Sequence, residues 1–349
     1  MVAFILLLGA LCLYKIDFAN PKTNFDDYLS IEKTNSIKGI FILIVIFQHF
    51  NQYVEYSSFI DVQYLRFFNC IGQRMVTLFL FYSGYGIRES IAKKGSNYIK
   101  TIPTKRIGGV LFRFDTAVCL FLILDIILYG SAFPYSVKDV ALSFVAWSSV
   151  GNSNWYIFAI LFAYFFTFIS YKVCNKNYEL LNIAIIVVFC CVYIVIMHII
   201  KESYWYNTIL CYPLGMIWSL YKEKIRIIFQ NIWIWIFGIS LSFIIQSMSF
   251  IVQNIFITMI SYIAFTILIV LLTMKVSINN KILAWCGKHL FGIFILQRIP
   301  MIILKEFGIY DINIYLSFIV SVVVTLLLSA IYDALIDKVW KRICKLNNL

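Results

Sequence analysis

Long apolar runs alternate with short polar segments along almost the whole chain. The first long run, from Ile40 to Phe47, contains no polar residue. Because a helix needs about 20 apolar residues to cross the hydrocarbon of a bilayer, we interpret such runs as membrane-spanning helices. The pattern therefore predicts an all-α polytopic membrane protein with ten full spans. These spans cover approximately residues 38–54, 67–87, 107–129, 154–171, 182–200, 205–221, 231–250, 255–274, 289–304 and 314–336.

A shorter apolar run, Met1–Tyr14, precedes these spans. No basic segment lies in front of it and no small-residue cleavage site follows it, so we expect an uncleaved anchor rather than a signal peptide. We expect residues 1–29 to form this membrane anchor and a cytoplasmic linker. Residues 30–349 are then one membrane domain.

Composition excludes a soluble protein. The chain is 62% hydrophobic and 13% charged, whereas soluble domains are about 45–50% apolar and about 25% charged. The nine cysteines do not have the spacing of metal ligands, so no metal site is expected.

The distribution of charge predicts the orientation of the chain. Of the 29 Lys and Arg residues, 22 fall in the alternate loops that include the one after the first apolar run, 4 in the other loops and 3 within spans. Cytoplasmic loops of membrane proteins are enriched in Lys and Arg. This rule explains the net charge of +12 without a nucleic-acid partner. It predicts a multi-pass protein of the cell membrane with its C-terminus in the cytoplasm and its N-terminus outside.

A few ionisable residues lie within the predicted spans, where charge is costly and usually serves a function. His49 is the leading candidate, because neutral imidazole is well suited to proton transfer near neutral pH. It follows Lys38 by eleven positions, about 16 Å of helix rise, which places it near mid-depth. The alternative is a histidine that only packs between helices. The other such residues are Arg74, Arg113, Asp115, Asp125, Arg298 and Asp333.

Arg298 and its neighbour Gln297 are expected at a similar depth to His49, and Arg74 enters its span from the outer end. Together these residues suggest a polar cavity that opens to the outside and binds substrate. The alternative is that each arginine snorkels to the interface or pairs with a structural carboxylate.

Two further segments carry candidate binding residues. The inner helix end "FYSGYG" contains Ser83 and Tyr85, and the basic loop that follows ends with Lys105 and Arg106. This region is a natural site for an anionic ligand from the cytosol, although any inner loop would be basic. On the outer side, Asn154 and Trp155 combine an amide with an aromatic face, as sugar-binding sites do. The alternative for them is an interfacial aromatic belt.

The motifs "YLSIEKTNSIKGIFILIVIFQHFNQYV", "LFLFYSGYGIRESI", "K-R-I", "NWY" and "FGIFILQRIPM" occur in this order from about residue 30 to the C-terminus. In this order the chain resembles the acyltransferase-3 family of integral membrane acyltransferases, in its Gram-positive branch that modifies cell-surface polysaccharides.

The resemblance implies ten core helices, with acetyl-CoA or another acyl-CoA bound from the cytosol. The acyl group would pass to a sugar hydroxyl outside the membrane, with His49 catalytic and Lys38 assisting on the acyl-CoA side. It also implies that Lys105 and Arg106 contact the CoA phosphates. The expected partners are therefore membrane lipids, the acyl-CoA donor and a surface glycan or lipid-linked sugar.

Two positions depart from the family pattern. Lysine stands at position 38, where the family usually has arginine, so the charge is kept but the bidentate fork is lost. The segment "NWYIFAI" lacks the glutamate that many members have there, so no mechanism that needs this glutamate is expected to apply.

Other functions remain open at this stage. A transporter or a translocase of lipid-linked sugars would also line a pathway with intramembrane charges, although the chain has no internal repeat of the kind common in transporters. An N-acyltransferase or a peptidoglycan O-acetyltransferase would differ only in the acceptor. The chemistry of His49, as general base or as acyl-imidazole, is also open.

Overall fold

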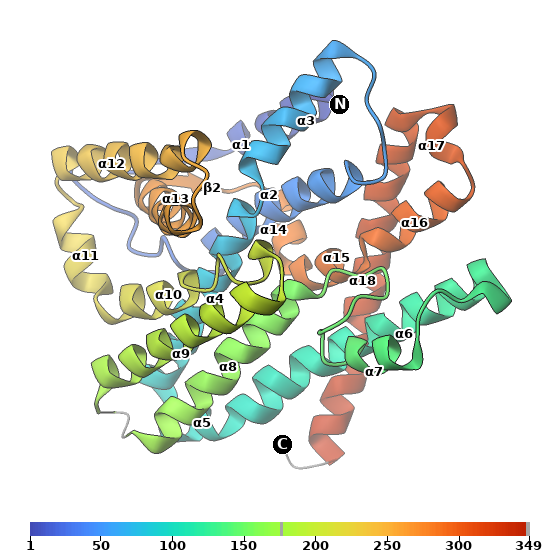
Figure 1. Cartoon of the computed structure of the whole chain (residues 1–349). Helices are drawn as coiled ribbons and strands as arrows, with labels where there is room; N and C mark the ends of the chain where they lie inside the picture. The colour runs from blue at the N-terminus through green and yellow to red at the C-terminus, as the bar shows by residue number, and fades with distance from the viewer. Residues whose placement is uncertain (175–176, 347–349) are drawn as a thin grey trace.

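Helices form almost all of the regular structure in the computed structural model, which describes residues 1–174 and 177–346. The chain ends with the long helix α18, which lies beside α6 (Figure 1). The first half contains α1 (Val2–Leu13), β1 (Ile16–Phe18), α2 (Ile31–Phe50), α3 (Phe59–Ile71), α4 (Arg74–Lys94), α5 (Ser96–Thr101), the π-helix η1 (Ile102–Gly108), α6 (Gly109–Tyr129), the 3-10 turn η2 (Gly130–Ala132), α7 (Val137–Ser143) and α8 (Trp155–Val173). The second half contains α9 (Glu179–Ile200), η3 (Ser203–Trp205), α10 (Cys211–Leu220), α11 (Lys222–Ile228), α12 (Ile232–Ile251), α13 (Ile255–Lys275), β2 (Val276–Ile278), α14 (Lys281–Lys288), α15 (Leu290–Leu296), α16 (Arg298–Glu306), α17 (Ile309–Ile312) and α18 (Ile314–Leu346).

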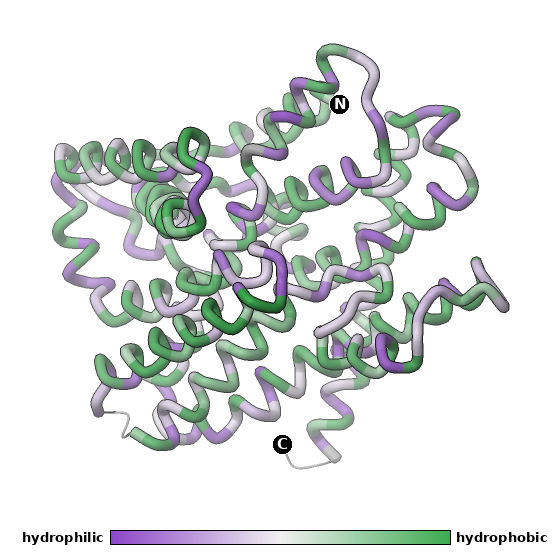
Figure 2. The backbone as a smooth tube through the Cα atoms, viewed as in Figure 1, coloured by the Kyte–Doolittle hydropathy of each residue, from purple (hydrophilic) through white to green (hydrophobic). Residues whose placement is uncertain are grey.

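The predicted class, an all-α polytopic membrane protein, is confirmed. Within the described residues, five helices are long and apolar enough to cross a membrane: α8, α9, α12, α13 and α18. A sixth candidate span is the bent pair Lys281–Lys288 and Leu290–Glu306, whose two parts meet at 66°. Helices α2, α4 and α6 are of similar length, with 20, 21 and 21 residues, but they carry more polar side chains. Figure 2 shows hydrophobic residues along the helices and hydrophilic ones mainly in the connections.

The predicted span 205–221 is shorter in the structure than expected. Only Cys211–Leu220 is α-helical, which gives ten residues and a length of about 15 Å. Pro213 lies in the first turn of α10, where the missing N–H of proline is tolerated. The helix begins only at Cys211. Helix α10 therefore does not cross a bilayer alone.

Residues 1–29 fold onto the rest of the protein. Helix α1 has 12 residues, about 18 Å, which is less than the thickness of a hydrocarbon core. The strand that follows, β1, pairs antiparallel with β2. The Lys275 ammonium also donates hydrogen bonds to the carbonyls of Pro21 at 3.0 Å and Thr23 at 2.8 Å. The linker is thus held at the end of α13.

Two helix pairs approach so closely that their backbones touch. In the pair α2 and α14, a Cβ on Gly39 would lie 1.9 Å from the Leu283 carbonyl oxygen, and one on Gly287 would lie 1.9 Å from that of Asn35. In the pair α4 and α10, a Cβ on Gly84 would lie 2.0 Å from the Tyr212 carbonyl oxygen. Small residues allow such contacts between membrane helices, and here they fix the positions of α2 and α4.

This packing generates a first prediction. Replacing Gly84 with alanine should force α4 and α10 apart, because the clash is with backbone that cannot rotate away. We expect a loss of about 1–3 kcal/mol in the free energy of unfolding, measured by thermal unfolding of the detergent-solubilised protein. Gly86→Ala is the matched control, since no atom lies within 4 Å of a Cβ there. Equal stability of the two variants would contradict the close contact.

Candidate active site

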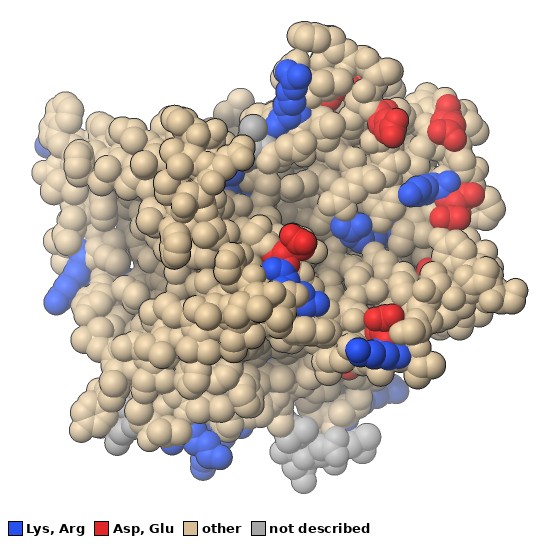
Figure 3. Space-filling model, in the orientation of Figure 1, with Lys and Arg blue, Asp and Glu red and all other residues tan. Residues whose placement is uncertain are grey.

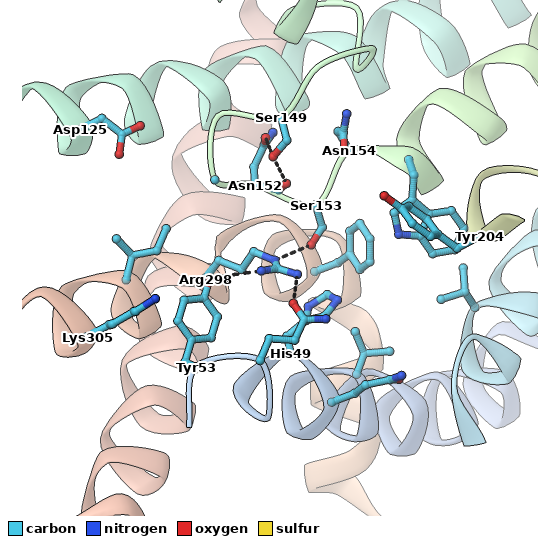
Figure 4. A pocket seen from close by; sticks show the side chains of 18 of the residues that line it. His49, Tyr53, Asp125, Ser149, Asn152, Ser153, Asn154, Tyr204, Arg298 and Lys305 are labelled. Carbon is cyan, nitrogen blue, oxygen red and sulfur yellow. Dashed lines mark hydrogen bonds between the residues drawn. The ribbon is translucent and has the colours of Figure 1, made fainter. Parts of the chain in front are cut away.

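A cavity with a volume of about 870 Å³ opens beside the C-terminal end of α2. We call it the His49 cavity. Side chains from α2, α6, α16 and the segment between α7 and α8 point into it (Figure 4). Its polar lining includes Gln48, His49, Gln52, Tyr53, Asp125, Ser149, Asn152, Ser153, Asn154, Arg298 and Lys305.

His49 lies one residue before the end of α2. The helix begins at a conventional N-cap, in which the Ser30 hydroxyl accepts a hydrogen bond from the Lys33 N–H at 3.3 Å. The last residue of α2, Phe50, is fully buried against Tyr310 and Phe318. Because both ends of α2 are fixed, the imidazole is held at the cavity wall with its ring centroid 6.4 Å from that of Phe294.

One side of the His49 ring faces protein and the other faces the cavity. Its Nδ1 atom is fully buried and has no hydrogen-bond partner among the described residues. The side chain as a whole is only half-buried, since it lines the cavity. Gln297 and Arg298 are polar side chains that interact with it. The ring is therefore accessible to a small molecule in the cavity.

Arg298 is held at the cavity by three neutral oxygens. Its Nε donates to the Ser153 hydroxyl at 3.0 Å, Nη1 to the Tyr53 hydroxyl at 3.1 Å and Nη2 to the Gln52 Oε1 at 2.6 Å. In Figure 4 these hydrogen bonds, drawn as dashed lines, reach Arg298 from three sides. Within residues 1–174 and 177–346 no carboxylate forms an ion pair with it. A guanidinium has five N–H groups, so two remain available.

A break in the helix explains why Arg298 is placed there. Helix α15 ends at Leu296 and α16 begins at Arg298, with Gln297 between them. Pro300 has no N–H to bond the Leu296 carbonyl, which favours the break. Gln297 is fully buried, and its Nε2 donates to the Phe294 carbonyl at 2.9 Å while its Oε1 has no partner among the described side chains and backbone. Of the pair predicted for the cavity, Arg298 lines it, whereas Gln297 is fully buried and is not part of the lining.

The segment before α8 forms the wall opposite α2. Asn154 is buried, and its Nδ2 donates to the Ala146 carbonyl at 2.9 Å. Gly151 has a φ of 86°, which favours glycine, and Ile302 and Phe121 crowd the position of a Cβ there. Asn154 and Trp155 both line the cavity as predicted. Their side chains are therefore not simply part of an interfacial belt.

The far side of the cavity is acidic. Asp125 is buried and its Oδ2 has no partner within the described part of the chain. Glu306 accepts a hydrogen bond from the Tyr129 hydroxyl at 2.8 Å. Burial, followed by the carboxylate of Asp125, raises the pKa of Tyr135 to about 12, so this loop tyrosine is a neutral hydrogen-bond donor at physiological pH.

Arg74 does not line this cavity, in contrast to the prediction. It is the first residue of α4 and faces α12 and α13. Its Nη2 donates to the Ser249 hydroxyl at 2.7 Å, and its guanidinium lies over the rings of Phe250 at 4.4 Å and Tyr262 at 5.5 Å. These contacts give Arg74 a structural role, close to the alternative considered from the sequence.

A second cavity of about 460 Å³ lies at the other end of α2. We call it the Lys38 cavity. The Lys38 ammonium lies 5.4 Å from the centre of the Tyr82 ring and has no hydrogen bond or ion pair with any described residue. The neighbouring cations are neutralised, because Lys222 pairs with Glu89 at 2.9 Å and Arg226 with Glu223 at 3.0 Å. Lys38 is therefore the cation of this cavity that lacks a counter-charge.

The other residues predicted for a cytosolic ligand are only partly gathered there. Tyr85 lines the Lys38 cavity, but Ser83 instead faces Tyr156 of α8. Lys105 and Arg106 lie in η1 and do not line the cavity. The Arg106 Nε donates to the Tyr98 hydroxyl at 2.7 Å, and Lys105 is exposed. The loop expected to carry this pair is a helix that continues into α6, which turns the pair away from Lys38.

The two cavities lie along one face of α2. Eleven residues are about three turns, so Lys38 and His49 project from the same side. Ile42 and Val45 lie between them on this side and are almost completely buried. The cavities are thus separated by about one packed helical turn.

Several lining residues could not be assigned from sequence. Gln52, Tyr53 and Ser153, which hold Arg298, are ordinary polar residues in or beside turns. Lys305 and Glu306 carry charge at the end of a predicted span, where no function is required. The only feature of the sequence that could have identified these lining residues is their position after a predicted span that contains an intramembrane charge. No group of three or more His, Cys, Asp or Glu side chains suited to a metal occurs among the described residues.

The fold and the site define an integral membrane protein whose helices enclose a polar cavity with a histidine and an arginine without counter-charge. Comparison with protein families identifies the class more closely, because the model of a family described as "Acyltransferase domain" matches residues 32–333. The chain belongs to this family and is a membrane acyltransferase. Searches of curated proteins and of solved structures found no significant match.

The contrast between the two arginines gives a second prediction. Arg74→Met should lower the free energy of unfolding by about 2 kcal/mol, because it removes a charge-assisted hydrogen bond and two cation–π contacts. Thermal unfolding in detergent measures the loss. Arg66→Met on α3 is the control, because Arg66 is exposed. If Arg74→Met left stability intact, the structural role would be wrong.

Proposed function

We propose that the protein transfers an acetyl group from cytosolic acetyl-CoA to a hydroxyl of a polysaccharide outside the cell membrane. The Lys38 cavity faces the cytosol in this proposal and the His49 cavity faces outward. The excess of Lys and Arg in alternate loops supports this orientation. In Figure 3 acidic side chains gather beside α16 and α17, while basic ones are visible at the lower end near the C-terminus.

The Lys38 cavity suits an anionic donor. Its unpaired ammonium can bind phosphate, and the rings of Tyr82 and Tyr85 offer apolar walls for the rest of the molecule. Bound acetyl-CoA would supply an activated acyl carbonyl. The acyl end must pass the turn formed by Ile42 and Val45 to reach His49.

His49 is the general base in this proposal. Its neutral ring accepts the proton of the acceptor hydroxyl while the hydroxyl oxygen forms a bond to the acyl carbon. When the bond from the acyl carbon to sulfur breaks, the imidazolium returns the proton to the leaving sulfur. An ester and a thiol result, and His49 is neutral again.

Arg298 stabilises the negative charge that this step creates. Its three bonds to neutral oxygens fix the guanidinium beside His49 and leave two N–H groups unused. A preorganised cation of this kind favours an oxygen that becomes negative in the transition state. Asn154 and Trp155 then contact the acceptor sugar, together with the buried carboxylate of Asp125.

One observation carries the proposal. His49 and the unpaired Arg298 share a cavity, and the unpaired Lys38 lines a second cavity along the same face of α2. The rival function, a transporter or sugar translocase, also predicts polar cavities at both ends. It does not require an acyltransferase domain over residues 32–333.

Loss of His49 gives the third prediction. His49→Ala should reduce acetyl transfer by at least about 10²–10⁴-fold, because no other histidine among the described residues lines this cavity. Transfer of labelled acetyl from acetyl-CoA to surface glycan, in membranes that contain the variant, measures this loss.

His198→Ala is the matched control for this experiment. The His198 Nδ1 bonds the Tyr206 hydroxyl at 2.7 Å and His198 does not line either cavity. This variant should retain transfer. Normal transfer by His49→Ala, with the protein present at its usual level, would refute the role of His49.

Lys38 gives the fourth prediction. Lys38→Met should raise the KM for acetyl-CoA about tenfold or more, because it removes the only unpaired cation that lines this cavity among the described residues. Lys38→Arg keeps the charge and should retain most of the affinity. An unchanged KM in Lys38→Met would place the donor elsewhere.

A further inference from the structure

A third cavity adjoins the His49 cavity on the side of Tyr204. It is a shallow groove of about 620 Å³ between α7, the segment after it and the start of η3. We call it the Trp147 groove. Ser149, Asn154 and Tyr204 line both this groove and the His49 cavity. In Figure 4 these three side chains lie along one edge of the His49 cavity. The two spaces are therefore continuous across a shared border.

The wall between the two spaces is rigid. Ala146 has a φ of 59°, a left-handed conformation that costs a residue with a Cβ about 1–3 kcal/mol. The Asn154 side-chain amide donates a hydrogen bond to the Ala146 carbonyl at 2.9 Å. The next carbonyl, that of Trp147, accepts a hydrogen bond from the Lys201 ammonium at 3.1 Å. Strain that the surroundings maintain in this way is typical of binding sites.

The groove offers the chemistry of a carbohydrate site. Tyr204 is 42% exposed and meets Trp155 at the shared border, with 6.1 Å between ring centroids. Such faces can stack on sugar rings. The Glu202 carboxylate has no hydrogen-bond or ion-pair partner among the described residues, and the Asp139 carboxylate uses only Oδ2, which accepts from the Ser136 hydroxyl at 2.6 Å. Carboxylate oxygens accept hydrogen bonds from sugar hydroxyls.

The charge of the groove indicates which sugars fit. Two carboxylates, Asp139 and Glu202, face one ammonium, and that ammonium of Lys201 is already placed over the rings of Trp147 at 4.1 Å and Trp205 at 4.2 Å. A net negative groove repels acidic sugars and favours neutral hydroxylated ones.

We infer that the Trp147 groove is a second saccharide subsite, which binds a neutral sugar unit next to the one that is acetylated. The acceptor is then a glycan of at least two joined sugars that crosses Tyr204 from the groove into the His49 cavity. Acetylation follows the joining of these sugars. The inference rests on the proposed function, because it assigns the acceptor of the same site.

The test compares long and short acceptors. The probes are O-deacetylated surface glycan from cells that lack the gene, used intact and after complete acid hydrolysis to single sugars. Membranes with the wild-type protein should acetylate the intact glycan with a kcat/KM at least tenfold higher. Ser148→Trp fills the groove without touching the His49 cavity and should remove this preference. Its transfer to single sugars should stay unchanged.

A second variant guards against misfolding of Ser148→Trp. Glu202→Gln keeps the size of an exposed side chain and should raise the KM for the intact glycan several-fold, with kcat unchanged. Val137→Trp is the control for added bulk, because Val137 is 87% exposed on α7 and lies outside the groove.

The outcomes separate the two proposals. Equal kcat/KM for single sugars and intact glycan in the wild type would overturn the second subsite and leave the acyltransferase proposal standing. The second subsite would also be overturned if Ser148→Trp lost the same kcat/KM on both acceptors and Glu202→Gln had no effect. Transfer to neither acceptor by the wild type would overturn both proposals together.

Discussion

The contact between the backbones of α2 and α14 is the constraint on which the candidate site depends. Gly39 and Gly287 allow this contact because neither carries a Cβ. Helix α2 carries His49 in its last turn, and α14 opens the bent span that leads through α15 to Arg298. Fixing α14 against α2 therefore sets where the break after Leu296 falls relative to the imidazole. A shift of one helical turn would move Arg298 by about 5 Å, more than its bonds to Gln52 and Tyr53 could follow.

Charge without a counter-charge is the second common feature of the two cavities. An isolated cation within a membrane protein is costly, and several cations of this chain are paired with carboxylates, as Lys222 is with Glu89. Lys38 and Arg298 have no carboxylate partner among the described residues. Lys38 lies near the Tyr82 ring, and Arg298 donates to three neutral oxygens. Fixed neutral dipoles keep such a cation in place while leaving its charge available to a ligand. Anionic groups or developing negative charge are the partners that this arrangement favours.

The sequence predicts the class of the fold and the centre of the site, but not the neighbours of that centre. The apolar runs predicted helices, and the eleven-residue spacing from Lys38 predicted that His49 lies near mid-depth, because helical rise determines depth. Gln297 and Arg298 met His49 as expected, since matching depth in the bilayer limits where they can lie. Arg74 has a similar depth but faces α12, because depth does not specify the direction around a helix axis. Lys105 and Arg106 turned away for a related reason: a π-helix continues into α6 where a loop was expected.

The packed turn between the cavities distinguishes an enzyme from a transporter in physical terms. A transporter must open a path wide enough for its whole substrate, which would require Ile42 and Val45 to leave their buried positions. An acyltransferase needs only a narrow passage for a small acyl group on a flexible chain, while both larger substrates stay on their own sides. In the proposed function, the buried apolar turn also keeps water from His49 on the side of the acyl-CoA, where water would hydrolyse a thioester. Separation by one turn of α2 is therefore what transfer of a small group between two compartments requires.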